Sequence, residues 1–291
     1  MGNIVLGMTN SYSLAKSIAR VSKTSYMSID ISNFPDGETY LRFPKSVNGK
    51  NVFIVQSLNP NPNKSLIELI FAGRTAKDLG AKKVHAIIPY LAYMRQDKRF
   101  NSGECLSSKV IGNLLSSFNS IITIDPHLHR YKNLGQVFKI KSVKLSATQP
   151  LATFIKNNFQ NSLIVGPDIE SFQWVSLVAN QINFPFTVLK KKRFSSRKVR
   201  IKDEGQNFKG KKVVIVDDVI SSGHTIIETA KLLKRRGASQ INVICTHGIF
   251  SEDALLKIKK EGVNQVVSTN TIHSKVSKIN IASLFLKIIK K

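Results

Sequence analysis

Lys211-Lys-Val-Val-Ile-Val-Asp-Asp-Val-Ile-Ser-Ser-Gly-His-Thr225 is the stretch that decides the fold, because an apolar run ends in two carboxylates and a turn of small polar residues. Val213–Val216 has the length and the β-branched content of a strand buried on both faces. The spacing of Ile226–Arg236 is typical of an amphipathic helix. We expect a ligand between the two, since open parallel sheets bind ligands beyond their carboxyl ends and a helix N-terminus attracts phosphate.

The side chains of this stretch indicate the chemistry of that ligand. Asp217 and Asp218 would repel a phosphate, but they suit sugar hydroxyls or a bound cation. The turn after them suits a phosphate, because its residues are small or carry hydroxyl donors: Ser221, Ser222, Gly223 and Thr225. A helix-capping turn without a ligand is the alternative, although a cap needs only one acid. The stretch therefore predicts a pocket for a phosphorylated sugar.

Alternation of strand-like and helical segments predicts an α/β fold with mostly parallel sheets flanked by helices. The pattern resets near residue 145, so we expect two related α/β domains, residues 1–145 and 146–291, with the last helix packed back on the first domain. The strand Ile121–Ile124, followed by Asp125, is expected to match the strand that precedes Asp217. The other strand-like runs are Ile4–Leu6, Val52–Gln56, His85–Ile88, Ser162–Val165 and Ile241–Thr246.

Composition limits the classes of function. The 291 residues are 42% hydrophobic, and no stretch approaches the eighteen apolar residues of a membrane span, so we expect a cytosolic protein. Cys105 and Cys245 lie too far apart in sequence to suggest a disulfide framework. A formal charge of +26 fits a nucleic-acid partner, a polyanionic substrate or a lysine-rich surface. No zinc-knuckle or helix-turn-helix pattern is present, so nucleic acid is not expected as the main partner.

Two loops in the first half carry polar side chains that could bind a ligand. Asn33-Phe-Pro-Asp-Gly-Glu38 places acceptors on a tight turn, although Pro-Asp-Gly sequences are often no more than turns. In Pro89–Arg99, a predicted strand enters a loop with several arginines and lysines. Arg95 suits phosphate oxygens and Gln96 a base edge, and the alternative is a solvated basic loop.

Histidine and aspartate follow two further strands. His127 and His129 share one side if Asp125–His129 stays extended, but no third zinc ligand is nearby, so a role of His127 near phosphates and magnesium is favoured. Asp168 follows another strand and could hold Mg²⁺ through water, or it could cap the helix that begins near Ser171.

The densest basic cluster, Lys190–Lys202, is either a solvated face or a segment that folds over a triphosphate and neutralises its developing charge.

In this order the segments resemble the ribose-phosphate diphosphokinases (phosphoribosyl diphosphate synthetases) from end to end, and in particular their shorter archaeal variants. The resemblance implies a role for each matching residue. It implies ATP binding by Phe34, Asp36, Gly37, Glu38, Arg95, Gln96 and Asp97, catalysis by Lys191, Arg193 and His127, and a metal site at His127 and Asp168. It implies ribose 5-phosphate binding by Arg193, Asp217, Asp218, Ser221, Ser222, Gly223, His224 and Thr225.

The family's reaction transfers the diphosphoryl group of ATP to O1 of ribose 5-phosphate, which gives phosphoribosyl diphosphate and AMP for nucleotide biosynthesis. The resemblance also implies Mg²⁺ as the cofactor and a homodimer or higher homo-oligomer. A regulatory relative without activity and a nucleobase phosphoribosyltransferase are the alternatives. The first would lack residues such as Lys191, and the second needs only one domain and no Arg95-Gln96 segment.

Three positions depart from the family's pattern. Ser221 stands where many members have an acid, and Cys105 where a proline is common. His224 stands where the family usually has a glycine, so a backbone φ above zero there would be strained.

Overall fold

The computed structural model of the protein describes residues 2–128, 130–193, 199–202 and 206–290, with the backbone alone for 191–193 and 199–202. The chain divides into two compact units. Unit 1 comprises Met1–Ser146, Thr271–His273 and Ile281–Lys291, and unit 2 comprises Ala147–Asn270 and Ser274–Asn280. The chain therefore crosses from unit 1 to unit 2 after Ser146 and returns near its end. Within the described part, no helix is long and apolar enough to cross a membrane.

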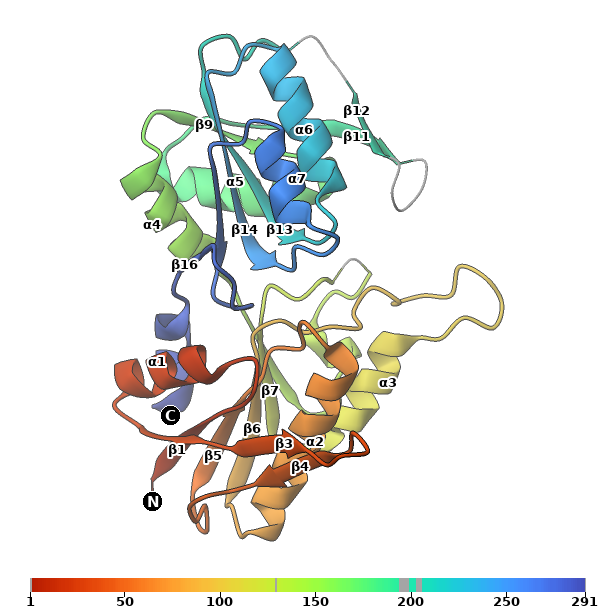
Figure 1. Ribbon diagram of the computed structural model, residues 1–291, viewed down its shortest axis with the longest axis vertical. Coiled ribbons are helices and arrows are strands. Elements are labelled where there is room, and N and C mark those ends of the chain that lie inside the picture. The colour runs from red at the N-terminus through yellow and green to blue at the C-terminus, as the bar shows by residue number, and fades with distance from the viewer. Residues whose placement is uncertain (1, 129, 194–198, 203–205, 291) are drawn as a thin grey trace. The chain divides into compact units, whose positions relative to one another are not determined.

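Unit 1 is built on a six-stranded parallel sheet in the order β2-β1-β5-β6-β7-β8. An antiparallel hairpin, β3–β4, lies between β2 and β5 along the chain. Helix α1 lies on one face of the sheet, with the C-terminal α8 packed against it, and α2 and α3 lie on the other (Figure 1). The strands are β1 Asn3–Gly7, β2 Ser25–Ser28, β3 Asp30–Asn33, β4 Thr39–Arg42, β5 Asn51–Val55, β6 Lys83–Ile88, β7 Ser120–Ile124 and β8 Lys141–Leu145. The helices are α1 Tyr12–Ser22, α2 Pro62–Asp78, α3 Ser107–Leu114 and α8 Leu286–Ile289, with 3₁₀ turns at Leu115–Ser117, Leu134–Gln136 and Ala282–Phe285.

Unit 2 repeats this plan with a parallel sheet in the order β10-β9-β13-β14-β15-β16. Its antiparallel hairpin, β11–β12, again lies between the second and third strands along the chain. Helices α6 and α7 pack together in front of the sheet in Figure 1, and α5 lies behind it. The strands are β9 Ser162–Gly166, β10 Phe186–Val188, β11 Lys190–Arg193, β12 Val199–Lys202, β13 Lys212–Ile220, β14 Gln240–Gly248, β15 Gln265–Thr269 and β16 Ser277–Ile279. The helices are α4 Thr148–Asn158, α5 Phe172–Ile182, α6 His224–Arg235 and α7 Ala254–Lys260, with a 3₁₀ turn at Ile169–Ser171.

The two sheets are parallel and covered by helices, so their central strands are apolar throughout. All five residues of β7 are buried, and Val213–Val216 of β13 are 0% exposed. Runs of this kind form strands buried on both faces because parallel strands need crossover helices, which cover the sheet. The predicted α/β architecture of two related domains is confirmed.

Individual hydrogen bonds show how closely the units repeat each other. The N–H of Ile29 donates to the carbonyl of Gly7 (3.2 Å), just as the N–H of Leu189 donates to that of Gly166 (2.9 Å). Each bond joins the end of the first strand to the residue before the hairpin. The hairpins therefore start at equivalent points, and Asn33 of β3 holds the backbone position that Arg193 holds in β11.

The third strands are also in register. The N–H of Gly49 donates to Gly80 O, and the N–H of Gly210 donates to Gly237 O, both at 2.8 Å. All four glycines have a positive φ, a conformation that favours glycine. Asn51 is the first residue to pair with β1, and Lys212 holds the same place beside β9.

Counting from these bonds shows which residues of unit 1 match the acid pair. Gln56 and Ser57, directly after β5, are the counterparts of Asp217 and Asp218. The expectation that the strand Ile121–Ile124 matches the strand before Asp217 is wrong, because β7 is the fifth strand of its sheet and β13 the third. The order of strands in a sheet depends on long-range pairing, which a local sequence pattern does not contain. The edge strands β2 and β10 were not among the predicted strands.

His85 on β6 gives the stability of unit 1 a pH dependence. Its ring stacks on Phe53 (4.7 Å between centroids), and Nδ1 lies 2.7 Å from Ser120 Oγ. Burial, helped by Lys83 and Lys141, lowers the His85 pKa from 6.5 to about 4. Because the unfolded chain then binds more protons, the free energy of unfolding should fall as the pH drops from 6.5 towards 4. We expect a loss of about 1–2 kcal/mol, less than the whole shift would give, because the ring is only partly buried.

Denaturant titrations between pH 7 and 4.5 measure this loss. His85→Asn should flatten the profile, whereas His273→Asn, at an exposed position of the same unit, should leave it as in the wild type. A His85→Asn profile as steep as that of the wild type contradicts the prediction.

Candidate active site

The acid pair lies inside β13, which continues to Ile220 and does not end at Val216 as the sequence suggested. Asp217 Oδ1 accepts a hydrogen bond from the N–H of Asp218 (3.0 Å), and Asp218 Oδ1 accepts one from the N–H of Val219 (2.8 Å). Pairing with β14 carries the strand past the acids, which is why the sequence did not reveal its end.

Asp217 lies among groups that raise its proton affinity. Burial raises the pKa of Asp217 well above its ordinary value, and the charges of Asp218 and Asp168 raise it further. Asp217 pairs with Cys245 on β14. Burial, together with the charges of Asp217 and Asp218, raises the pKa of the Cys245 thiol as well. In the protein alone the cluster is electrostatically unfavourable, so a ligand with a positive charge or hydroxyl donors would relieve it. Cys245 is a buried free thiol.

The turn after β13 leads directly into α6. Gly223 adopts φ 77° as the residue before the helix, and His224 is the first helical residue. The positive φ therefore falls on the glycine, and His224, which is not among the residues with a positive φ, has no strain of that kind. Nδ1 of His224 lies 2.8 Å from Ser222 Oγ, and Ser221 Oγ lies 3.3 Å from Ser251 Oγ. The backbone N–H groups of this helix start remain the anion-binding feature of the turn.

Asp168 follows β9 in the same unit. Its side chain accepts a hydrogen bond from the N–H of Ser171 (3.1 Å), so it caps the 3₁₀ turn that begins α5. The capping alternative is therefore present in the structure. Capping does not prevent Asp168 from lying beside a cation, because one carboxylate can accept the capping hydrogen bond and contact an ion. Its charge also acts on Asp217.

In unit 1, the loop Phe34–Glu38 is the tip of the β3–β4 hairpin. Two backbone hydrogen bonds close it, one from Phe34 N to Glu38 O (2.8 Å) and one from Gly37 N to Phe34 O (2.9 Å). Asp36 Oδ1 accepts from Glu38 N (3.2 Å), and Gly37 has φ 94°. Phe34 is 49% exposed, and its ring meets that of Tyr40 in a T-shaped arrangement with 5.7 Å between centroids. The loop is an ordered turn that presents an exposed aromatic ring.

The Arg95 loop follows β6, and hydrogen bonds from Arg130 and Ser108 hold it in place. Asp97 is buried and accepts a hydrogen bond from Arg130 Nη1 (2.7 Å), so its carboxylate faces the protein. Ser108 donates its hydroxyl to Gln96 O (3.1 Å), which fixes the backbone. The side chains of Arg95 and Gln96 are exposed. These two are the residues of the segment that are free to meet a nucleotide, whereas Asp97 supports the loop.

The remaining candidates are described only in part. His127 follows β7, in unit 1, and is partly buried. His129 and the side chains of Lys191 and Arg193 lie outside the described residues, although Lys191 and Arg193 belong to β11. The structure therefore brings Asp168, Asp217, Asp218 and the Ser221–Thr225 turn together in unit 2, and it places the Phe34 and Arg95 loops and His127 in unit 1.

Known proteins identify the family of this chain. The model of the N-terminal domain of ribose phosphate pyrophosphokinase matches residues 3–118, and the phosphoribosyl transferase domain model matches residues 134–277. A ribose-phosphate pyrophosphokinase from Methanothermobacter thermautotrophicus is 35% identical over 287 residues, which cover 99% of this chain and 100% of the relative. The chain belongs to the ribose-phosphate pyrophosphokinase family.

Other pyrophosphokinases agree with this assignment. The enzyme of Saccharolobus solfataricus is 34% identical over 93% of both chains. The crystal structure of phosphoribosylpyrophosphate synthetase from Mycobacterium smegmatis matches with a TM-score of 0.84 and 25% identity, over 99% of this chain and 98% of that one. The predicted resemblance to the family is confirmed along the whole chain, and with it the class of enzyme, a transferase.

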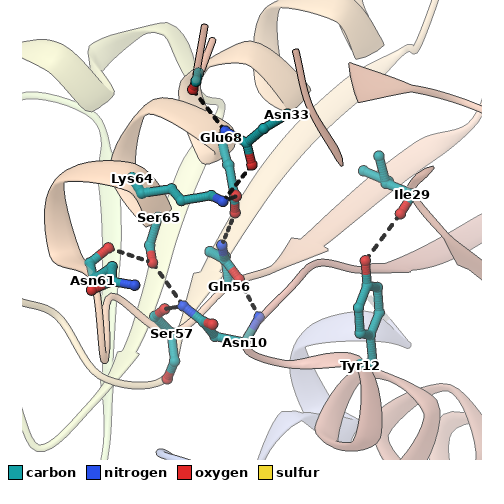
Figure 2. A network of polar contacts seen from close by, with 11 residues as sticks. Asn10, Tyr12, Ile29, Asn33, Gln56, Ser57, Asn61, Lys64, Ser65 and Glu68 are labelled. Carbon is teal, nitrogen blue, oxygen red and sulfur yellow. Dashed lines mark hydrogen bonds and ion pairs between the residues drawn. The ribbon is translucent and has the colours of Figure 1, made fainter. Parts of the chain in front are cut away.

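Unit 1 also contains a polar network, drawn in Figure 2, that the sequence did not reveal. Glu68 of α2 is only 1% exposed, and its Oε2 accepts a hydrogen bond from Gln56 Nε2 (2.9 Å). Gln56 Oε1 accepts from the N–H of Asn10 (3.2 Å), and the Asn10 amide donates to Ser65 Oγ (2.7 Å). The only sequence signal was the i, i+4 spacing of Lys64 and Glu68, which is ordinary on exposed helices.

Proposed function

We propose that this chain transfers the diphosphoryl group of ATP to O1 of ribose 5-phosphate and releases AMP and phosphoribosyl diphosphate. The observation that carries the proposal is the β13–α6 turn. It joins an acid pair to a helix start through a glycine with positive φ, in a chain that belongs to the pyrophosphokinase family. A sugar phosphate needs both halves of this turn, acids for its hydroxyls and backbone N–H groups for its phosphate.

In the proposal, unit 2 supplies the ribose 5-phosphate contacts. Asp217 and Asp218 accept hydrogen bonds from the ring hydroxyls. The Ser221–Thr225 segment and the first N–H groups of α6 hold the 5-phosphate. Because burial and the charges of Asp218 and Asp168 raise the pKa of Asp217 in the protein alone, hydroxyl donors bound there remove an electrostatic penalty. The sugar is thereby oriented with O1 ready to attack the β-phosphorus of ATP.

Unit 1 supplies the nucleotide contacts in the proposal. The Phe34 ring offers a face for the adenine base, and Arg95 a fork for phosphate oxygens. Gln96 is placed to reach an edge of the base. Lys191 and Arg193 on β11 stabilise the charge that develops on the transferring group and on the leaving oxygen of AMP. His127 contacts the phosphates.

The residues of the sites fit Mg²⁺ as the proposed cofactor. Magnesium is commonly held by one or two carboxylates together with substrate phosphates and water, and not by a cage of protein ligands alone. The described residues contain no cluster of three or more His, Cys, Asp and Glu arranged for a metal. The unfavourable charge around Asp217 is the kind of environment that a cation relieves. Asp168 and His127 are the proposed metal residues, and the ion would neutralise phosphate charge when bound.

We place the reaction in the cytoplasm, as a step of nucleotide biosynthesis, with a homodimer or higher homo-oligomer as the working form. ATP and ribose 5-phosphate are the proposed partners, and neither nucleic acid nor a membrane has a part in the proposal.

The test is an incubation of the purified chain with ATP, Mg²⁺ and ribose 5-phosphate, followed by chromatography of the nucleotides. AMP should form in step with phosphoribosyl diphosphate, and AMP formation should stop when ribose 5-phosphate or Mg²⁺ is left out. Folded protein that yields no AMP refutes the proposal. Conversion of a nucleobase and phosphoribosyl diphosphate to a nucleotide, without AMP formation from ATP, would instead identify a phosphoribosyltransferase.

A further inference from the structure

Asn33 stands at the base of the Phe34–Glu38 loop and is bonded on both sides of its amide. Its Nδ2 donates to Gly37 O (2.7 Å), so the side chain closes the loop from within. Its Oδ1 accepts a hydrogen bond from Nζ of Lys64 (2.7 Å), which comes from α2 (Figure 2). The loop is therefore tied to a helix of the unit's core through one amide group.

Lys64 is tied in turn to a buried charge. Its Nζ lies 4.0 Å from Oε1 of Glu68, one helical turn further along α2. The Lys64 side chain is 43% exposed and that of Glu68 only 1%. Within the described part of the chain, Oε1 of Glu68 accepts no hydrogen bond, so the Lys64 ammonium is the group that compensates this oxygen. The buried carboxylate therefore restricts where the ammonium can lie.

Glu68 is itself fixed by the loops that follow β1 and β5. Gln56 Nε2, from the loop after β5, donates to its other oxygen, and the N–H of Asn10, from the loop after β1, donates to Gln56 Oε1. Burial raises the pKa of Glu68, while Thr9, Lys64 and Gln56 lower it. The anchor is rigid because its partners come from the ends of two central strands.

The repeat of the two units shows what these residues replace. By the shared hydrogen bonds, Gln56 is the counterpart of Asp217, and Thr9 that of Asp168. In unit 2 these places carry the proposed sugar and metal acids, whereas in unit 1 they carry uncharged side chains that hold Glu68. Asn33 is likewise the counterpart of Arg193 on the catalytic hairpin. In unit 1, the place of the proposed sugar and metal acids is therefore occupied by a network of protein hydrogen bonds that ends at the Phe34–Glu38 loop.

We propose that Lys64 is a positioning residue for the Phe34–Glu38 loop, held in place by Glu68 and acting through Asn33. The inference rests on the proposed function only in naming ATP as the molecule that the loop receives. Lys64 itself contacts no substrate in this proposal. It keeps the loop in its binding conformation before the nucleotide arrives, so its loss should cost nucleotide affinity and not the chemical step.

The experiment compares Lys64→Met, Lys64→Arg and the wild type, with Lys77→Met as the matched control. Lys77 is exposed in the last turn of the same helix. Lys64→Met should raise the KM for ATP about five- to tenfold, the loss expected for one ordinary hydrogen bond, with kcat and the KM for ribose 5-phosphate nearly unchanged. Lys64→Arg should recover most of the ATP affinity because it keeps the charge, and Lys77→Met should behave as the wild type.

Amide hydrogen exchange measures the protection of the loop's amides and does not depend on enzyme activity. In Lys64→Met, the amides of Phe34 and Gly37, which close the turn, should exchange about tenfold faster, and those of β6 should not change. An active wild type whose Lys64→Met variant keeps both the KM for ATP and the loop protection overturns the inference. A wild type that forms no AMP refutes the proposed function instead, and the exchange result then decides the inference alone.

Discussion

Replacement of Lys191 by alanine is expected to lower kcat by about two orders of magnitude or more, with a much smaller change in the KM for ATP. The size follows from the loss of one fixed donor at a developing negative charge, which costs roughly 100- to 1,000-fold in other enzymes. The split between kcat and KM follows because such a donor acts mainly in the transition state. Steady-state rates of AMP formation, with each substrate varied in turn, measure both constants.

Lys209→Ala is the control for the loss of a positive charge, since Lys209 is an exposed lysine of the same unit. It should leave both constants within about twofold of the wild type, as expected for an exposed charge. Wild-type turnover in the Lys191→Ala variant removes Lys191 from the proposed catalytic role. A loss confined to KM would make it a substrate-binding residue.

The two units carry their hairpins at equivalent places along the chain. Both are inserted between the second and third strands of their units, and both start after an equivalent hydrogen bond. The first presents the exposed Phe34 loop, and the second carries Lys191 and Arg193. The two sheets therefore provide two equivalent hairpins, to which the proposed function assigns nucleotide binding and charge stabilisation.

The sequence predicted those parts of the fold that local pattern determines. Helix α6 occupies His224–Arg235, close to the predicted Ile226–Arg236, and β7 occupies Ser120–Ile124, which contains the predicted strand Ile121–Ile124. The predicted end of β13, Val216, was four residues short of the observed end, Ile220. The two acids look like a strand end in the sequence, and only the pairing of Val219 and Ile220 with β14 shows that the strand continues.

Long-range polar contacts were not predictable. Glu68 and Lys64 have the spacing of an exposed ion pair, yet one is buried under the loops after β1 and β5. Asp97 was assigned to ATP with its neighbours, but its carboxylate meets Arg130, thirty-three residues later. In both cases the partner is brought near by the sheet, and the sequence around the residue carries no signal of it.

Asp217→Asn is expected to separate activity from stability. The substitution removes a charge that burial, Asp218 and Asp168 make unfavourable, and the asparagine Oδ1 can still accept the hydrogen bond from the N–H of residue 218. The free energy of unfolding, measured without ligands, should therefore stay the same or rise by about 1 kcal/mol. In contrast, kcat/KM for ribose 5-phosphate should fall about 100-fold, because the proposed acceptor for a sugar hydroxyl loses its charge.

Glu228→Gln is the matched control, because it neutralises a partly exposed carboxylate of α6 whose partner is Lys231 at 2.9 Å. It should cost at most about 0.5 kcal/mol and leave kcat/KM unchanged, as is usual for an exposed i, i+3 pair. Chemical denaturation and initial rates on the same preparations give both quantities. A less stable Asp217→Asn protein would mean that the carboxylate supports the fold. An unfavourable charge cluster is commonly kept where a ligand needs it. Full activity together with retained stability would therefore show that the sugar site does not need the Asp217 charge.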